Sequence, residues 1–265
     1  MSKKITVVDL LNMKAEGEKI GSLTAYDASF ATILDEAGIE VVLVGDSLGM
    51  VLQGEDSTLK VSMDEMVYHT RIVSPKCQQA FVITDLPYRS YETTDMALEN
   101  ARRLMNEGGA QAVKLEGGVE VAEIVDALTN NMIPVCGHVG LQPQSVEIYG
   151  GYKVQGRDES SAEQILKGAQ ALQEAGAMMI VLECIPAELA AKITKSVDIP
   201  TVGIGAGVDC DGQVLVLYDL LGISGRSSHM TKNFLAENGN IRDAVTAYVD
   251  AVKSGNFPTA VHSFK

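Results

Sequence analysis

The chain has 265 residues, of which 46% are hydrophobic and 21% charged, a composition typical of a folded globular protein rather than a disordered one. Its 35 acidic residues outnumber its 21 basic ones, and the formal net charge of −14 disfavours nucleic acid and anionic lipid as partners. We recognise neither a signal peptide nor an apolar segment long enough to cross a bilayer. No Cys-x-x-Cys pair occurs, and we interpret the four cysteines as reduced thiols of a cytoplasmic protein (Cys77, Cys136, Cys184 and Cys210).

A helix end, a glycine and a short apolar strand recur along the chain. The segments "DEAGIEVVLVGDS", "NEGGAQAVKLEGG" and "QEAGAMMIVLEC" all follow this plan. In chain order, strands are predicted near residues 20–25, 41–45, 81–84, 112–115, 134–138, 178–183, 201–205 and 214–219. The last segment, within "GQVLVLYDLLG", is also compatible with a helix.

Helices are predicted between these strands. Ser62 and Glu65 have the spacing of a capping box, and Ser160 and Glu163 repeat it. Eight alternating strands and helices predict a (β/α)8 barrel in a single domain over residues 1–265, with a helix before the barrel and a helical tail after it. The rival fold is a doubly wound sheet, but its GxGxxG fingerprint is missing from the first strand–helix turn.

Acidic residues end several predicted strands. Asp46 follows "VVLVG", Asp85 ends "VITD", Glu116 follows "VKL" and Glu183 ends "IVLE". Consecutive acids are separated by one βα unit of roughly 30 residues, and the last two by two units. Since active sites of such barrels lie at the C-terminal ends of the strands, we expect the four acids to converge. Their repulsion would be relieved by a hard divalent cation, Mg²⁺ first and Mn²⁺ next.

The alternative interpretation is that these acids cap the following helices or lie solvated in loops. It suits one acid, but four at this spacing, with Lys114 among them, favour a site. His138 also ends a strand, where a structural or positioning role fits better than metal binding. His69 lies in a predicted helix and is not expected to be catalytic. The glycine-rich loop Tyr149–Arg157 is either a mobile lid or a plain connector.

Several motifs of the chain occur together, and in this order, in one known family. They include "TAYD", "VGDSLGM", "DLPY", "VKLEGG", "PVCGHVGL", "GGYKVQGR", "VLECIP" and the terminal "HSF". From about Thr24 to Phe264 the chain therefore resembles the ketopantoate hydroxymethyltransferases. The resemblance implies a barrel of the phosphoenolpyruvate/pyruvate-binding type. It also implies transfer of a one-carbon unit from 5,10-methylenetetrahydrofolate to 3-methyl-2-oxobutanoate, giving ketopantoate for pantothenate and coenzyme A, and a homo-oligomer that is commonly a decamer.

The resemblance also implies roles for single residues. The metal ligands would be Asp46, Asp85 and Glu116, the substrate contacts Asp46, Ser47, Asp85 and Lys114, and the catalytic base Glu183. In the mechanism that we hypothesise, Glu183 removes the C3 proton of the 2-oxo acid, and the resulting enolate attacks the methylene carbon carried by the folate. His138 would orient the substrate.

Two further classes of function stay open. The same site could run a folate-independent aldolase or lyase reaction, or the barrel could be a binding scaffold without catalysis. The chain also departs from the family pattern in two places. "GRSSHMTKNF" (residues 225–234) lacks an expected Pro-Lys/Arg-Phe, and Glu55 replaces a more usual His or Tyr. We expect these changes to affect folate contacts, a lid or subunit packing.

Overall fold

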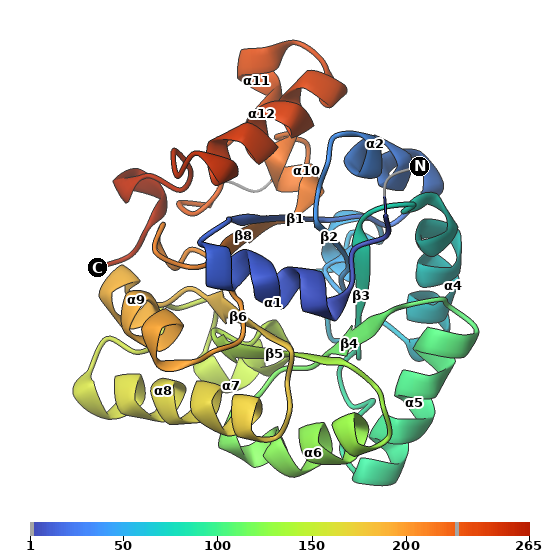
Figure 1. Cartoon of the computed structure of the whole chain (residues 1–265), viewed down its shortest axis with the longest axis vertical. Helices are drawn as coiled ribbons and strands as arrows, with labels where there is room; N and C mark the ends of the chain where they lie inside the picture. Colours follow the sequence, from blue (N-terminus) through green and yellow to red (C-terminus); the bar gives the residue numbers. More distant parts are fainter. Residues whose placement is uncertain (1–2, 226–227) are drawn as a thin grey trace.

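The computed structural model describes residues 3–225 and 228–265, and the strands within these ranges close into one barrel (Figure 1). Each strand is parallel to its neighbours, and β8 pairs with β1 to complete the ring. The strands are β1 (Ile20–Thr24), β2 (Val41–Val44), β3 (Phe81–Asp85), β4 (Ala112–Lys114), β5 (Val135–Gly140), β6 (Met179–Glu183), β7 (Thr201–Ile204) and β8 (Gly212–Leu215). The predicted (β/α)8 barrel is confirmed.

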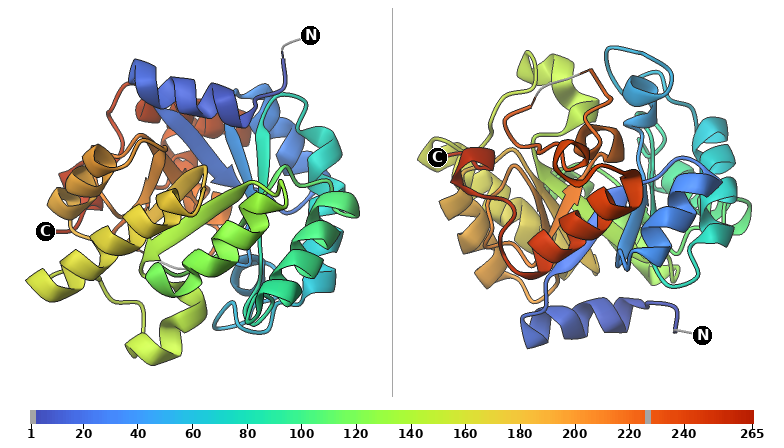
Figure 2. Two further views of the ribbon diagram at one scale, coloured as in Figure 1. Left: turned by 60° about the horizontal axis from the view of Figure 1, so that its bottom comes forward. Right: turned by 90° about the horizontal axis from the view of Figure 1, so that it is seen from above.

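Helices surround this barrel, as the two views of Figure 2 show. The outer helices are α2 (Ala28–Glu36), α4 (Met63–Val73), α5 (Thr94–Asn106), α6 (Ala122–Asn130), α8 (Glu159–Glu174), α9 (Ala187–Ser196) and α12 (Ile241–Lys253). Shorter helical turns are α3 (Leu48–Val51), α7 (Val146–Tyr149), α10 (Leu217–Leu220), α11 (Leu235–Asn238), η1 (Ser74–Lys76), η2 (Val119–Val121), η3 (Pro143–Ser145) and η4 (Ala260–His262). No helix within the described ranges is long and apolar enough to cross a membrane.

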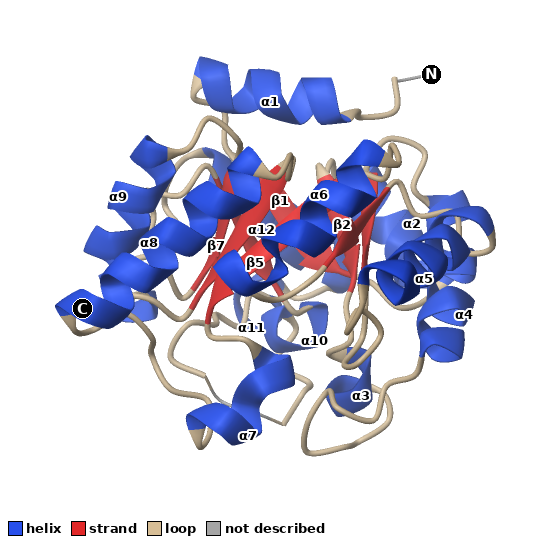
Figure 3. Ribbon diagram, turned by 90° about the horizontal axis from the view of Figure 1, so that it is seen from below, coloured by secondary structure: helices blue, strands red, loops and turns tan. Residues whose placement is uncertain are grey.

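The two ends of the barrel differ (Figure 3). Helix α1 (Val7–Glu16) lies across the N-terminal end of the strands, where Leu10 is fully buried. The opposite end carries α3, α7, α10 and α11. Every residue of the eight strands is buried except Glu183, the last residue of β6. This exception places an acidic side chain at the C-terminal end.

Strand β8 ends earlier than the sequence predicts. It spans Gly212–Leu215, and residues 217–220 form the helical turn α10. The N–H of Leu217 leaves the ladder and donates to Thr24 Oγ1 at 2.9 Å. Leu217 and Leu220 are both fully buried by this turn. The prediction of a strand over 214–219 was wrong in its second half because a helical turn can bury the same apolar run.

The two predicted capping boxes also differ in outcome. The box of Ser62 and Glu65 is confirmed at the start of α4, where each residue bonds the backbone N–H of the other. The prediction of a capping box at Ser160 and Glu163 was wrong, since α8 begins two residues earlier than this box requires. Its N-cap is Asp158, whose carboxylate accepts the Ser161 N–H at 3.0 Å. A carboxylate accepts this bond more strongly than a neutral hydroxyl.

The C-terminal part of the chain returns to the C-terminal end of the strands. Helix α12 packs against β1 and α2, within the outer helical layer. The segment after it reaches α9, where the Ala187 N–H donates to the carbonyl of Phe264 at 3.0 Å. This contact holds the "HSF" motif at the mouth of the barrel.

Candidate active site

A cavity of about 460 Å³ opens at the C-terminal end of the strands. Its wall contains every site residue that the sequence predicts, namely Asp46, Ser47, Asp85, Lys114, Glu116, His138 and Glu183. The predicted convergence of the acids is therefore confirmed, whereas their individual roles stay predictions.

The register of the parallel strands produces this convergence. Asp85, Lys114 and Glu183 are the last residues of β3, β4 and β6. Asp85 and Lys114 are direct partners in the sheet register. Asp46 and Glu116 follow their strands by two residues. Because all strands run the same way, their ends meet at one edge of the barrel.

Each of the three predicted metal ligands has one carboxylate oxygen fixed by an N–H donor. Asp85 Oδ2 accepts the backbone N–H of Asp46 at 3.0 Å. Asp46 Oδ2 accepts the side-chain amide of Gln144 at 2.8 Å. Glu116 Oε2 accepts the backbone N–H of Gln144 at 3.0 Å. Among the hydrogen bonds of the described residues, the second oxygens of Asp46 and Glu116 receive no such donor, whereas Asp85 Oδ1 faces the ammonium of Lys114.

Lys114 provides the positive charge in this cluster. Its Nζ lies 2.8 Å from Asp85 Oδ1, and both side chains are almost completely buried. The pair is an ion contact without hydrogen-bond geometry, because Asp85 Oδ1 has no hydrogen-bond partner. Burial disfavours the lysine cation, but Asp85, Glu116 and Asp46 outweigh burial and raise the pKa of Lys114. Lys114 is thus an ammonium that can only donate hydrogen bonds.

Burial and crowding oppose the ionised form of two of the acids. Desolvation, followed by the charge of Asp85, raises the pKa of Asp46 to about 7. Burial also raises the pKa of Glu116 well above its ordinary value, against the opposing charge of Lys114. Five carboxylates line this cavity with one ammonium: the four predicted acids and Asp219 face Lys114. A divalent cation would remove much of this imbalance.

The proton position on His138 follows from its neighbours. Lys114 Nζ lies 3.4 Å from His138 Nδ1, so Nδ1 is the acceptor and Nε2 carries the proton. Burial, and next the charge of Lys114, lower the pKa of His138, which keeps the ring neutral. Nε2 lies 3.3 Å from Glu183 Oε2 but has no hydrogen-bond partner of good geometry. The ring therefore presents a buried N–H to the cavity.

The donor set has the chemistry that a magnesium site needs. In the ranges 3–225 and 228–265, no group of three or more His, Cys, Asp or Glu side chains is arranged so that it could hold a metal ion as it stands. Asp46 and Glu116 nevertheless each keep one oxygen without an N–H donor, and Asp85 Oδ1 contacts only the Lys114 ammonium. Oxygen donors of this kind fit Mg²⁺ better than a softer metal.

Four residues at the site escaped the sequence analysis. Tyr26 OH lies 2.8 Å from Ser47 Oγ and fixes that hydroxyl at the start of α3. Gln144 donates to the carboxylates of Asp46 and Glu116, and Tyr91 OH donates to Gln144 Oε1 at 2.7 Å. Thr58 lines the cavity with a buried hydroxyl that has no hydrogen-bond partner. Tyr26 occurs in the quoted motif "TAYD", but its role, like that of Gln144, depends on contacts between distant parts of the chain.

The rest of the cavity wall is mainly apolar. Val181, Ile204, Val214 and Leu215 contribute from the strands, and Phe264 from the C-terminal segment. Such a wall suits a short aliphatic group beside the acids.

The departures from the family pattern lie partly at this wall. Ser228, His229 and Met230 line the cavity, and Met230 Sδ lies 3.4 Å from Cys184 Sγ. Residues 226–227 lie outside the described residues. Glu55 forms an ion pair with Lys60 at 2.5 Å.

Three other expectations can be compared with the structure. Within the loop Tyr149–Arg157, Tyr152 lines the cavity, and its hydroxyl lies 3.5 Å from Met50 Sδ. A closing movement of this loop stays a prediction. His69 Nδ1 bonds the carbonyl of Tyr26 at 2.6 Å, which is a structural contact. All four cysteines are free and buried, as expected of reduced thiols.

Solved structures define the class of this barrel. Phosphonopyruvate hydrolase, solved in complex with oxalate and Mg²⁺, matches with a TM-score of 0.63 and 14% identity, over 97% of this chain and 92% of that chain. 2,3-Dimethylmalate lyase, a member of the PEP mutase/isocitrate lyase superfamily, matches with a TM-score of 0.58 and 15% identity, over 89% and 87%. At this identity the likeness concerns the fold alone, a closed (β/α)8 barrel.

Sequence comparison defines the family within that class. Residues 4–260 match the ketopantoate hydroxymethyltransferase family. Proteins named 3-methyl-2-oxobutanoate hydroxymethyltransferase are 58% identical in Nitrosococcus oceani, over 96% of this chain and 97% of the relative, and 56% identical in Methylococcus capsulatus, over 100% and 98%. The chain belongs to the ketopantoate hydroxymethyltransferase family, so the predicted resemblance is confirmed.

Proposed function

We propose that this enzyme transfers a hydroxymethyl group from 5,10-methylenetetrahydrofolate to 3-methyl-2-oxobutanoate and so makes ketopantoate for pantothenate and coenzyme A. Membership of the family supports the reaction. The observation that carries the assignment to this cavity is the position of Glu183. Its carboxylate lies beside a buried, unpaired N–H of His138, in the cavity that also holds the three clustered acids.

Asp46, Asp85 and Glu116 are the residues that would hold Mg²⁺, with Mn²⁺ as the next choice. A bound Mg²⁺ would supply Lewis acidity to the 2-oxo acid and so increase the acidity of its C3 hydrogen. The N–H donors on these acids orient the carboxylates. Lys114 adds a fixed positive charge that favours an anionic substrate.

The neighbouring polar groups position the substrate. His138 donates from Nε2 to a substrate oxygen, because Lys114 occupies Nδ1. Ser47 supplies a hydroxyl that Tyr26 holds in place. The apolar wall around Val181 and Leu215 accommodates the isopropyl group of 3-methyl-2-oxobutanoate. These contacts would place the C3 hydrogen toward Glu183.

Glu183 is the proposed general base. It is the only strand residue among the described strands that is not fully buried, so its carboxylate is accessible from the cavity. After proton removal, the nucleophilic C3 carbon attacks the methylene carbon of the folate, the bond from that carbon to one folate nitrogen breaks, and this nitrogen takes up the proton. Water then displaces the second folate nitrogen, so that its oxygen becomes the product hydroxyl, its proton passes to that nitrogen, and tetrahydrofolate leaves.

The cellular setting is part of the same proposal. Four free, buried thiols support a location in the reducing cytoplasm. The acidic charge of −14 supports small-molecule rather than nucleic-acid partners. Family resemblance supports a homo-oligomer, with a decamer as the expected form.

Proton exchange tests this function directly. The protein is mixed with 3-methyl-2-oxobutanoate and Mg²⁺ in D₂O, and the C3 proton is followed by NMR. We expect metal-dependent loss of the C3 signal, abolished by Glu183→Gln. Addition of 5,10-methylenetetrahydrofolate should then give ketopantoate.

Two results would contradict the proposal. A C3 proton that persists with Mg²⁺ and with tetrahydrofolate present would exclude enolisation of this substrate. Cleavage or condensation of 2-oxo acids without any folate would favour the aldolase or lyase alternative.

A further inference from the structure

We propose that Gln144 is a positioning residue that holds Asp46 and Glu116 in the orientation needed to bind the divalent cation. This inference rests on the metal site of the proposed function. Gln144 is 5% exposed and lies in η3, directly after β5. From there it contacts both acids, although they follow different strands and Asp46 lies 98 residues away in the chain.

The side-chain amide of Gln144 uses both of its N–H groups. One donates to Asp46 Oδ2 at 2.8 Å and the other to the carbonyl of Leu86 at 3.0 Å. Its oxygen accepts the hydroxyl of Tyr91 at 2.7 Å. A flipped amide would place its oxygen against the carboxylate of Asp46 and against a carbonyl. The orientation of the amide is therefore determined by its partners.

The backbone of Gln144 completes a closed set of contacts around Glu116. Its N–H donates to Glu116 Oε2 at 3.0 Å, while the Glu116 N–H donates to Tyr91 OH at 3.3 Å. Tyr91 thus joins the Gln144 side chain to the backbone of the residue whose carboxylate Gln144 holds. One residue fixes one oxygen of each acid and leaves Asp46 Oδ1 and Glu116 Oε1 for a ligand.

Because Gln144 is neutral, substituting it can change the orientation of the carboxylates without changing the charge of the cavity. Replacing it by methionine removes three hydrogen bonds but leaves the net charge of the cavity unchanged. Partners of this kind, one contact away from the metal, change affinity by roughly 10- to 100-fold when they are lost. A weaker affinity of this variant for the divalent cation would therefore indicate that the carboxylates have lost their orientation, and not that the cation is less strongly attracted by charge.

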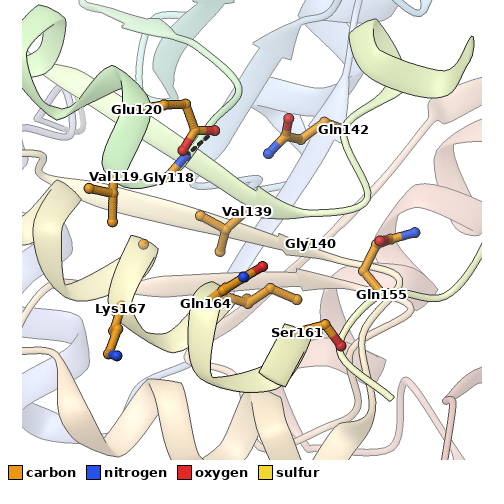
Figure 4. Close-up of a pocket in the computed structure, with 12 residues that line it drawn as sticks. Gly118, Val119, Glu120, Val139, Gly140, Gln142, Gln155, Ser161, Gln164 and Lys167 are labelled. Atoms are coloured by element: carbon orange, nitrogen blue, oxygen red, sulfur yellow. Dashed lines mark hydrogen bonds between the residues drawn. The ribbon is translucent and has the colours of Figure 1, made fainter. Parts of the chain in front are cut away.

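The chain offers a matched control two residues away. Gln142 lines a cavity of about 330 Å³, together with Gln155 and Gln164 from the neighbouring loop and α8 (Figure 4). It also lines a small cavity beside Glu116 and Gln144, but no hydrogen bond among the described residues joins its side chain to either metal-binding acid. Gln142→Met makes the same chemical change beside β5 without touching Asp46. Figure 4 also shows Glu120 bonded to the N–H of Gly118 at this cavity.

Mn²⁺ binding without substrate tests the inference. The full chain is titrated with Mn²⁺, and free metal is measured by electron paramagnetic resonance. We expect Gln144→Met to raise the dissociation constant for Mn²⁺ roughly 10- to 100-fold. Gln142→Met should leave this constant within about twofold of the wild-type value. Thermal unfolding of the metal-free variants checks that both are folded.

Tyr91→Phe is the second variant, and it keeps the bond between Gln144 and Asp46. It should weaken Mn²⁺ binding less than Gln144→Met. In the double variant the two effects should be less than additive, because Tyr91 acts partly through Gln144 and partly through its own contact with the Glu116 backbone. Equal Mn²⁺ affinity of Gln144→Met and the wild type would overturn the role of Gln144 while leaving the metal site intact. A wild type that takes up no Mn²⁺ would overturn the metal site itself and the role of Gln144 with it.

Discussion

Buried acids occur at both ends of this barrel, but their hydrogen bonding differs. At the N-terminal end, Asp35 accepts three backbone N–H groups from residues 78–80, at 2.8 to 2.9 Å. Glu40 accepts the Gly21 N–H at 2.8 Å and pairs with Lys253 at 2.6 Å. These carboxylates hold the strand starts together, and their capacity to accept hydrogen bonds is well used.

At the C-terminal end the polar groups are only partly satisfied. Four buried side-chain atoms in the described ranges lack a hydrogen bond, and three of them line the cavity: Asp85 Oδ1, His138 Nε2 and Thr58 Oγ1. The fourth, Ser90 Oγ, lies in the loop after β3 at the same end. Asp85 Oδ1 still has the ion contact with Lys114, and His138 Nε2 lies 3.3 Å from Glu183 Oε2. Since buried polar groups without good hydrogen bonds reduce stability, their location at one end indicates a site suited to a polar ligand.

The largest expected effect is on catalysis. Glu183→Gln keeps the size of the side chain but removes its basicity, so kcat should fall by roughly 10²- to 10⁴-fold. The rate of C3 exchange measures this loss. Glu188→Gln, on the outer helix α9, is the control and should retain wild-type exchange. Full exchange by Glu183→Gln would move the base to another residue.

A change at the other end should affect stability instead. Asp35→Ala leaves three backbone N–H groups without their acceptor, so the free energy of unfolding should fall by at least about 2 kcal/mol. Urea unfolding measures this value. The C3 exchange rate of the folded variant should stay close to that of the wild type. A comparable loss of exchange would remove the functional distinction between the two ends.

Removing a charge from the acids of the cavity should stabilise the metal-free protein, in contrast to Asp35→Ala, and the effect should depend on pH. The raised pKa of about 7 means that Asp46 keeps its proton in the folded protein at pH values where the unfolded chain has lost it. The unfolded state then binds fewer protons, so the contribution of Asp46 to stability is complete below about pH 4 and is lost as pH rises through about 7.

Asp46→Asn in metal-free protein isolates this contribution. At pH 8 the free energy of unfolding of the variant should be about 1 kcal/mol higher than that of the wild type. This difference should disappear near pH 4. Melting temperatures across this pH range, measured with a chelator present, provide the comparison. A constant difference between variant and wild type at all pH values would contradict the assignment to Asp46.

The smallest effect is expected for a group that acts through another. Tyr26→Phe removes the partner of the Ser47 hydroxyl, at a cost of about 1 kcal/mol, so KM for the 2-oxo acid should rise up to about tenfold with kcat nearly unchanged. Steady-state kinetics with the folate at saturation measure both constants. Tyr68→Phe, at an exposed ring, is the control. A fall in kcat alone would place Tyr26 in the chemical step.

Much of this protein was readable from local sequence. Asp46, Asp85, Glu116 and Glu183 each follow an apolar run, and parallel strands must bring such residues to one edge. Their convergence is a consequence of strand direction, which the alternation of strands and helices already indicates. The motifs around them were sufficient to predict the family, which the comparisons confirm.

Tertiary structure decided what surrounds those acids. Gln144 meets Asp46 across 98 residues, and Tyr26 meets Ser47 across 21, so no local pattern marks either contact. The end of β8 was also decided by packing, because a helical turn and a strand bury the apolar run of 214–217 equally well. Local sequence determines which residues reach the end of a strand. The partners that orient them come from other strands and loops, and only the closed barrel brings these within hydrogen-bonding distance.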